Sequence, residues 1–487
     1  MARDADVVIV GSGPNGLAAA IALQQAGAQV LVLEGHRELG GGMRSAELTL
    51  PGFLHDVCSA AHPMGILSPY LRTLPLEQHG LVWMKPKVSV AHPLDEGDAV
   101  LLHKSVDETA RALGVDERAY RSLVTPFLRD PHAMFADALA PLRIPKHPLR
   151  MARFGLHAIR SAVGLAGRFS TPQARALLAG CAAHSILPLE QPLTAAVGLI
   201  FLLAGHVEEW PVARGGSRSI TNALVSLLRS LGGEVRTDTF VRTLSDLPPA
   251  RRVLFDTSPA QLALICAPVL PNGYVRRLLQ YRYGPGVFKI DYALDGPIPW
   301  RDARCREAST VHVGGTLEQL AEAEGAVGRG EHAARPFVMV VQQSECDDTR
   351  APAGKHTGYA YVHVPSGSTI DQTEVIEAQL ERFAPGFKQR VLARHTMGTQ
   401  ALAEYNANNV GGAITGGMAD LGQLFTRPVA RLDPYTTPNP RVLICSASTP
   451  PGGGVHGMCG YFAAQRALKG LERIPVASFG GGRVLTA

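Results

Sequence analysis

The chain has 487 residues, of which 47 are basic and 42 acidic, and its formal net charge is +5. This length exceeds one typical hydrophobic core and suggests two lobes, while the small positive balance argues against nucleic acid as a partner. The seven cysteines form no CxxC pair, which excludes a zinc knuckle and a redox dithiol and leaves no visible disulfide framework.

An apolar run begins almost at the N-terminus, at residues 7–10, and leaves no room for a cleavable secretory signal. The longest apolar run, residues 195–205, is far shorter than the ~18 residues that indicate a membrane-spanning helix. We therefore expect a cytoplasmic protein, which can still associate with a membrane surface.

The first sixty residues predict a dinucleotide-binding βαβ unit. A buried strand over 7–10 is followed by the turn Gly11–Gly16 (GSGPNG), a helix over 17–23 and a second strand over 29–34. The glycines allow a tight turn, close approach of the backbone to a diphosphate and close packing of helix on strand. The helix N-terminus then offers unpaired N–H groups to an anion. Glu34 has the spacing expected of a carboxylate that binds ribose hydroxyls.

The segment after Glu34 distinguishes flavin from nicotinamide. Arg37-Glu38-Leu39-Gly40-Gly41-Gly42-Met43-Arg44-Ser45 resembles the second glycine motif of the flavin amine oxidase and phytoene desaturase superfamily. Consecutive glycines permit close backbone approach, and a guanidinium suits a diphosphate. The resemblance implies that this segment lies along FAD, with Arg44 close to the pyrophosphate. No second GxGxxG follows a strand, so we expect no built-in NADPH site.

The C-terminal region carries a third motif. A strand over 441–445 precedes the glycine-rich segment 450–457 and an apolar helix over 462–468. This resembles the C-terminal flavin motif of the phytoene desaturase-like proteins, most closely the pyridine nucleotide-disulfide oxidoreductase domain-containing protein 2 branch. The resemblance implies a helix N-terminus at the flavin pyrimidine edge, where its dipole stabilises reduced flavin. Ser446 and Ala447 depart from the Gly-Asp or Gly-Glu of many relatives, so backbone or hydroxyl groups must contact flavin there.

The resemblance covers most of the chain and implies an α/β fold, with a Rossmann-like FAD-binding lobe interleaved with a mixed α+β substrate lobe. The first insertion is expected to be mostly helical over 105–205, and the second to combine strands (337–342, 358–364) with a helix near 373–383. The predicted segments are 1–70, 211–285 and 425–470 for the FAD-binding lobe, 71–210 and 286–424 for the substrate lobe, and 474–487 for a loose tail.

The resemblance also implies which residues bind the cofactor, FAD. They come from the three glycine-rich motifs, the ribose carboxylate and a segment after Gly232-Gly233 that contacts the adenine. The predicted residues are Gly11, Ser12, Gly13, Pro14, Asn15, Gly16, Glu34, Gly41, Gly42, Met43, Arg44, Val241, Gly453, Gly454, Val455 and Gly457.

Candidate catalytic residues are few, because hydride transfer to flavin N5 requires geometry and an apolar pocket more than an acid–base pair. In flavin amine oxidases, a Lys on the strand corresponding to that of Lys289 approaches N5 through a water; a surface lysine is the alternative. His62 and His456 lie in segments that the family places beside the flavin, and His184 and His312 are further candidates. A lone His is more often a packed or surface residue. No metal-ligand spacing is visible, so we expect no metal.

The helical insertion contains a strongly basic stretch. No acidic residue occurs between Asp137 and Glu190, and Lys or Arg alternates with apolar residues over 143–175. Such a basic amphipathic segment can lie on an anionic bilayer and admit a lipid-soluble substrate. A solvated basic face and a docking surface for a partner subunit are the alternatives, so an oligomer is also possible.

Three functions fit these motifs. The first is an FAD-dependent desaturase, dehydrogenase, saturase or isomerase that transfers hydride between an apolar substrate, such as a polyene or isoprenoid-like molecule, and flavin N5. The second is an amine or amino-acid oxidase, although these more often have an aromatic cage and this chain is only 6% aromatic. The third is a non-catalytic protein such as the GDP-dissociation inhibitors, which share the fold without flavin; retention of the glycine motifs argues against it.

Overall fold

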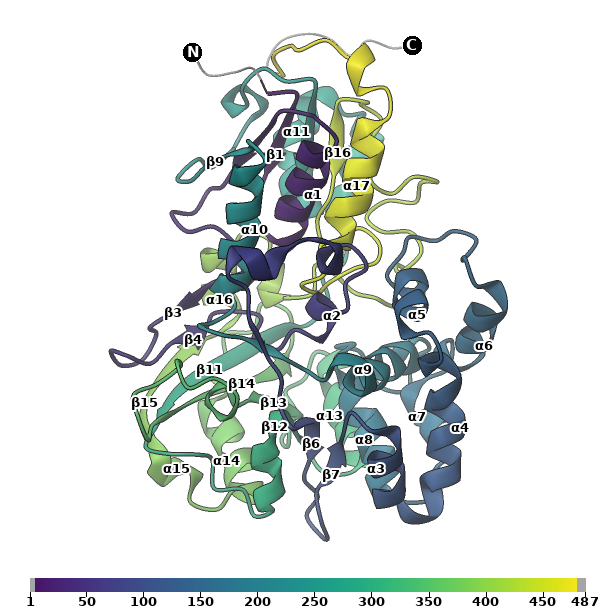
Figure 1. Ribbon diagram of the computed structural model, residues 1–487, viewed down its shortest axis with the longest axis vertical. Coiled ribbons are helices and arrows are strands. Elements are labelled where there is room, and N and C mark those ends of the chain that lie inside the picture. Colours follow the sequence, from purple (N-terminus) through teal and green to yellow (C-terminus); the bar gives the residue numbers. More distant parts are fainter. Residues whose placement is uncertain (1–4, 480–487) are drawn as a thin grey trace.

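Five short strands form the sheet that carries the N-terminal motif (Figure 1). The computed structural model describes residues 5–479, and in it this sheet is parallel throughout. The α/β, Rossmann-like class predicted from the sequence is confirmed. All five strands lie within the segments that we assigned to the FAD-binding lobe. Their order is β16 (Val442–Ile444), β10 (Arg252–Phe255), β1 (Val7–Val10), β2 (Val30–Leu33) and β9 (Glu234–Arg236).

Both faces of this sheet are covered by helices, as a parallel sheet requires. Successive side chains of a strand point to opposite faces. Val7 and Ile9 therefore pack on one side, whereas Val8 and Val10 belong to the core on the other. The first face is covered by α1 (Pro14–Gln25), α10 (Arg218–Ser230) and α17 (Met458–Leu468), and the second by α11 (Pro259–Cys266) and α12 (Asn272–Leu279).

A seven-stranded mixed sheet forms the centre of the second lobe (Figure 1). Its neighbouring strands are antiparallel except for one parallel pair, β6 with β12. Two of its strands occupy the stretches 337–342 and 358–364 that the sequence indicated. The order is β15 (Val391–Met397), β11 (Gly286–Leu294), β14 (His356–Val364), β13 (Val338–Val341), β12 (Ala308–Val313), β6 (Val88–His92) and β7 (Val100–Leu102).

The two faces of the large sheet have different neighbours. Phe383 and Phe387, from α14 (Thr373–Phe383) and α15 (Phe387–Arg390), pack on one face in a core with β11 and β14. On the other face, Tyr359 and Tyr361 share a core cluster with Val57, which follows the second glycine motif in the chain. This second face is therefore turned toward the FAD-binding lobe.

The remaining elements lie in the insertions and in two short ribbons. No helix within residues 5–479 is long and apolar enough to cross a bilayer. The ribbons pair β3 (Ser45–Ala46) with β4 (His55–Asp56) and β5 (Trp83–Met84) with β8 (Val212–Ala213). The helices are α2 (Pro63–Ile66), α3 (Val106–Ala112), α4 (Glu117–Leu128), α5 (Pro131–Ala138), α6 (Pro148–Ala158), α7 (Ala162–Ala166), α8 (Pro172–Ala183), α9 (Thr194–Glu208), α13 (Leu317–Gly328) and α16 (Thr399–Tyr405).

Residues 474–479 differ from the loose tail that we expected. Ala477 forms a β-bridge with Ala250, and Phe479 is buried with the Arg441 guanidinium 4.2 Å from its ring centroid. The guanidinium also donates to the carbonyl oxygens of Ala250, at 2.8 Å, and Ala477, and so fixes this end of the chain. The remainder of the predicted tail, including Gly480-Gly481-Gly482, lies outside the described residues.

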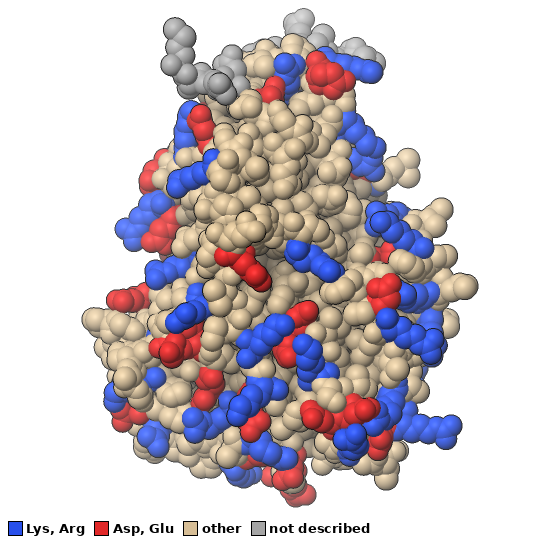
Figure 2. Space-filling view, viewed as in Figure 1, with Lys and Arg blue, Asp and Glu red and all other residues tan. Residues whose placement is uncertain are grey.

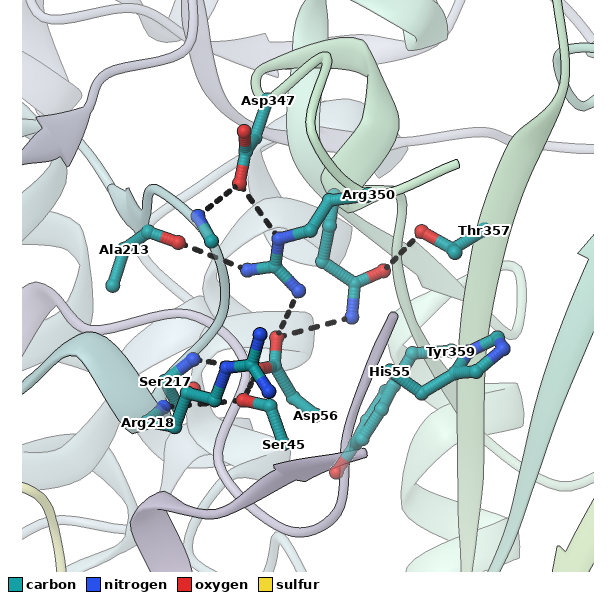
Figure 3. Close-up of polar contacts among 12 residues, drawn as sticks. Ser45, His55, Asp56, Ala213, Ser217, Arg218, Asp347, Arg350, Thr357 and Tyr359 are labelled. Atoms are coloured by element: carbon teal, nitrogen blue, oxygen red, sulfur yellow. Dashed lines mark hydrogen bonds and ion pairs between the residues drawn. The ribbon is translucent and has the colours of Figure 1, made fainter. Parts of the chain in front are cut away.

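A buried arginine joins the segment after the second glycine motif to the large sheet (Figure 3). Arg350 is fully buried and contacts Asp56 through Nη1 at 2.9 Å and Asp347 through Nε at 2.7 Å. Its Nη2 donates to the carbonyl of Ala213 at 3.0 Å. Asp56 also accepts the backbone N–H of Ser217, at the start of α10, at 2.7 Å. Three segments that are distant in sequence, around Asp56, Ala213 and Asp347, therefore meet at one guanidinium.

Each charge in this cluster depends on its partners. Burial opposes ionisation of Asp56, but the Arg350 charge and the Ser217 N–H outweigh that penalty and hold the pKa of the carboxyl below its ordinary value. Removing one member of a buried ion pair leaves an uncompensated charge, which is far more costly than the loss of an exposed pair.

We predict that Arg350→Met destabilises the protein by about 3–5 kcal/mol, because Asp56 and Asp347 would remain buried without a cation. The free energy of unfolding, from urea denaturation followed by circular dichroism, measures this. Arg304→Met is the matched control, since Arg304 is half exposed beside Asp302 and its loss should cost less than about 1 kcal/mol. Equal losses for the two variants would contradict the role given to Arg350.

Candidate cofactor and substrate site

One cavity of about 500 Å³ is lined by residues of both lobes. It is lined by the glycine turn, the end of β2, the second glycine motif and the C-terminal glycine segment. It also reaches parts of the chain that the sequence did not indicate. The lining segments are 10–15, 33–36, 41–42, 58–59, 61–65, 239–241, 256–258, 404–409, 446–448 and 454–455, with single residues such as Arg44 between and around them.

The glycine turn is packed too tightly for side chains. A Cβ on Gly16 would lie 2.2 Å from the carbonyl oxygen of Gly11, and one on Gly13 would lie 2.7 Å from Oδ2 of Asp256. The backbone of the turn therefore forms the wall of the cavity directly. An extended cofactor with a diphosphate fits such a wall, because the glycines allow it to approach the backbone of the turn closely.

Glu34 lines the cavity and is held by groups of the chain itself. Oε2 accepts from the backbone N–H of Ser12 at 3.1 Å and from its hydroxyl at 2.5 Å. Oε1 accepts from the N–H of His36 at 2.9 Å and pairs with Arg44 at 3.2 Å. The carboxylate is therefore fixed at the end of β2, beside Val241, which lies in the loop after β9 rather than in a strand.

Asp256 is the site residue that sequence reasoning missed. It follows β10, lines the cavity and accepts the backbone N–H of Gly16 at 2.8 Å. We had expected unpaired N–H groups at this helix N-terminus. The structure differs, because the Gly16 N–H already binds the Asp256 carboxylate. Burial raises the pKa of Asp256 to about 7, against the opposing effect of that N–H bond.

Three buried polar atoms of cavity-lining residues have no partner in the described chain: Oδ1 of Asn15, Nδ1 of His62 and Oγ1 of Thr257. Unpaired buried polar atoms are costly, and native proteins rarely retain them without a ligand or water. The glycine wall, the fixed ribose carboxylate and these atoms suit a long, polar cofactor. The residues present fit FAD.

His62 has a defined tautomer. The hydroxyl of Ser217 donates to the carbonyl of Ser59 at 2.5 Å, so it can only accept from Nε2 of His62, at 2.8 Å. Nε2 therefore carries the proton, and Nδ1 is a free acceptor. Burial lowers the pKa of His62 to about 4, which keeps the ring neutral at pH 7.

Ser446 and Ala447 line the same cavity, with Ser446 Oγ hydrogen-bonded to Ser448 at 2.6 Å.

Five predicted residues do not line the cavity but shape it from behind. Met43 is fully buried beneath the second glycine motif. Added Cβ atoms at Gly453 and Gly457 would meet the Thr415 carbonyl at 2.4 Å and Ala18 at 2.7 Å, so both glycines serve close packing. The remaining two are Gly16, against Gly11, and His456, whose Nδ1 accepts the Met458 N–H at 3.0 Å at the start of α17.

Lys289 is not a surface lysine. It is 2% exposed, pairs with Asp291, and lies 4.6 Å from the ring centroid of Tyr359. It does not line the cavity itself. The Tyr359 hydroxyl donates to the carbonyl of Cys58, which does line it, so one side chain separates Lys289 from the site. A role for Lys289 near flavin N5 stays a prediction.

His184 and His312 lie together behind the cavity. Their Nε2 atoms are 2.9 Å apart, and the His184 ring stacks on Phe201, which lines the cavity, at 4.5 Å. Burial lowers the pKa of His184 to about 3, so this histidine is neutral at pH 7. Within residues 5–479, no group of His, Cys, Asp or Glu side chains has the arrangement of a metal site.

We predict that Lys289→Met costs about 3–5 kcal/mol of stability, because Asp291 would remain buried and unpaired. The double variant Lys289→Met/Asp291→Asn removes both charges and should recover most of the loss. Urea denaturation of wild type and both variants measures this. A single variant within about 1 kcal/mol of wild type would show that the pair contributes little.

Comparison with known proteins agrees with this geometry. Residues 9–73 match the NAD(P)-binding Rossmann-like domain family. The chain is 27% identical to pyridine nucleotide-disulfide oxidoreductase domain-containing protein 2 of Mus musculus, over 96% of this chain and 94% of that protein. Over 25% of this chain and 22% of the relative, it is 34% identical to a limonene dehydrogenase polypeptide of Castellaniella defragrans.

The fold is shared with an amine oxidase. Wild-type putrescine oxidase bound to putrescine has a TM-score of 0.61 at 18% identity, over 97% of this chain and 99% of that chain. The similarity to the Mus musculus protein covers 96% of this chain and so runs through both lobes. The chain is thus homologous to pyridine nucleotide-disulfide oxidoreductase domain-containing protein 2 over nearly its whole length, and it shares its fold with putrescine oxidase.

Proposed function

We propose that the protein uses FAD to oxidise, reduce or isomerise an apolar small molecule, such as a polyene or isoprenoid-like compound. The observation that supports this proposal is the character of the cavity beyond the glycine turn. There the walls come from Met64, Phe201, Ile414 and Val455, together with backbone of the C-terminal glycine segment.

The carboxylates that line the cavity, Glu34, Asp256 and Glu404, come from other segments than these apolar walls. The lining residues in 58–65 and 446–455 include no Asp, Glu, Lys or Arg, and His62 is held neutral. An apolar substrate is stabilised by burial against such walls, at roughly 25 cal/mol per Å² of apolar surface. A charged amine would lose hydration without a compensating carboxylate. The site therefore favours an apolar substrate over an amine.

Bound FAD supplies the two-electron chemistry, with flavin N5 as the hydride acceptor or donor. The chain's own residues position the reactants and exclude water. Phe201 and Met64 form apolar walls, while the unprotonated Nδ1 of His62 offers a hydrogen-bond acceptor at the same end. The partial likeness to the limonene dehydrogenase polypeptide, a protein named for a terpene, supports an apolar substrate class.

Anaerobic reduction of the bound flavin tests the substrate class. Holoprotein is mixed with terpenes, carotenoid precursors and other polyenes, and in parallel with primary amines and amino acids, while flavin absorbance is recorded. We expect bleaching with members of the apolar panel only. Bleaching by amines with none by apolar compounds would overturn the proposal in favour of an amine oxidase.

We predict that Glu34→Ala weakens FAD binding ten- to hundredfold, or about 1.5–3 kcal/mol, because the ribose contact is lost and Arg44 loses its partner. Arg44→Ala should act in the same direction. Quenching of flavin fluorescence on titration of apoprotein gives the Kd. Glu38→Ala, an exposed carboxylate of the same loop, is the control and should bind as wild type does. Unchanged affinity in Glu34→Ala would remove the carboxylate from the cofactor site.

We further propose that the basic segment 143–175 rests on an anionic membrane, from which an apolar substrate can reach the cavity. Lys and Arg gather along the side of the molecule formed by the helical insertion (Figure 2). Large apolar side chains in and next to this segment are exposed, at 60–90% of full exposure. Exposed apolar side chains flanked by cations suit an anionic bilayer interface. The exposed apolar residues are Leu142, Ile144, Leu149, Leu156 and Ile159.

We predict that the protein co-sediments with phosphatidylserine-containing liposomes and is released as salt rises, because exposed charges are screened over about 10 Å at 0.1 M. Leu149→Ser/Leu156→Ser should reduce binding, whereas Leu432→Ser, an exposed leucine outside this segment, should not. No sedimentation with either neutral or anionic liposomes would favour a solvated face or a partner-docking surface, and equal sedimentation with both would contradict an electrostatic attraction to the bilayer.

A further inference from the structure

Asp256 places a carboxylate inside the part of the cavity best suited to a diphosphate. Its Oδ2 accepts the Gly16 N–H at 2.8 Å, and the side chain lies so close that a Cβ on Gly13 would be 2.7 Å from the same oxygen. Asp256 is 8% exposed and lines the cavity. An internal anion therefore already occupies the N-terminal end of α1, where anions bind most favourably.

The same end of the cavity carries an independent sign of a ligand. Asn15, within the glycine turn and in the first turn of α1, is 2% exposed and lines the cavity, and its Oδ1 has no partner in the described chain. This polar atom and the Asp256 carboxylate face one space. A bound diphosphate would therefore bring two negative charges next to a buried carboxylate.

Resting on the proposed use of FAD, we infer that Asp256 couples cofactor binding to uptake of a proton. Like charges in a buried site cannot both be ionised without a large penalty, so the bound diphosphate favours the protonated carboxyl. A protonated Asp256 can still accept the Gly16 N–H and gains an O–H donor directed into the cavity. Thermodynamic linkage is reciprocal: if bound FAD raises the proton affinity of Asp256, protonation of Asp256 raises the affinity for FAD by the same factor.

The surroundings of Asp256 bring its pKa near neutral pH, so proton uptake on FAD binding is expected in that range. Burial raises its pKa to about 7, with a smaller contribution from the charge of Glu34 at the end of β2. The thiols of Cys445, after β16, and Cys459, in α17, are its other titratable neighbours, and burial raises the pKa of both. These thiols are neutral, so the Asp256 carboxyl is the group that titrates here between pH 6 and 9.

The sign of the pH dependence follows from this pKa. Below pH 7 the carboxyl is already protonated in the apoprotein, and FAD binds without a proton change. Above pH 7 each binding event must take up a proton, so the affinity falls by about tenfold per pH unit. Asp256→Asn accepts the Gly16 N–H with a neutral side chain, and its affinity should not change over this range.

Titration of apoprotein with FAD at pH 6, 7, 8 and 9 tests this inference. Wild type should lose between ten- and hundredfold in affinity from pH 7 to pH 9, about tenfold per unit. Asp256→Asn should bind equally at each pH and more tightly than wild type at pH 9. Asp246→Asn, an exposed capping carboxylate of the same lobe, is the control and should retain the wild-type slope.

Calorimetry of wild type alone keeps the test independent of how the variants fold. FAD binding at pH 8 is measured in two buffers of different ionisation enthalpy, and the difference in heat gives the protons taken up. We expect uptake close to one proton per FAD at pH 8 and close to none at pH 6. FAD binding without proton uptake, or an equal slope in Asp256→Asn, overturns this inference and leaves the proposed function intact. No FAD binding at any pH overturns both.

Discussion

Backbone contact at the N-terminal end of α1 is the constraint on which the cofactor lobe depends. Gly16 allows the turn to close on the Gly11 carbonyl, where a Cβ would lie at 2.2 Å. On the other side of the helix, a Cβ on Gly460 would lie 1.8 Å from the Asn15 carbonyl, so α17 can pack against α1 only without a side chain there. The N-terminal end of α1 and the segment just before α17, Gly454 and Val455, are thereby brought to one cavity.

Two groups of buried charges are paired where the second glycine motif meets the large sheet. Arg350 lies between Asp56 and Asp347, and Lys289 pairs with Asp291. These pairs fasten the segment behind the second glycine motif to the large sheet and leave the apolar end of the cavity free of fixed charge. Asp256 has an N–H contact but no cation, and burial therefore raises its pKa although that contact opposes the rise.

Features set by short-range sequence patterns could be predicted. The glycine turn, the strand that ends at Glu34 and the C-terminal helix each occupy a few consecutive residues whose periodicity and glycines carry the information. The burial of Lys289 had a local signal too, since Lys289 and Asp291 are two residues apart in an otherwise apolar strand and therefore share one face.

Contacts between distant segments could not be predicted. Asp256 meets Gly16 only because β10 pairs with β1, and an Asp after a strand carries no signal by itself. The loop 404–409 reaches the cavity from the second insertion with no motif of its own, although Tyr405 stacks on His36 at 5.6 Å. His456 was assigned to the flavin from its neighbours in sequence, whereas its ring binds the start of α17.

The flavin content of the purified protein is the most direct test of whether this cavity holds FAD. Protein incubated with FAD is passed through gel filtration, and bound flavin is released by denaturation and compared with the protein concentration. We predict about one FAD for each chain, held without a covalent bond. Protein that remains colourless and flavin-free after this treatment would contradict the cofactor assignment and everything proposed from it.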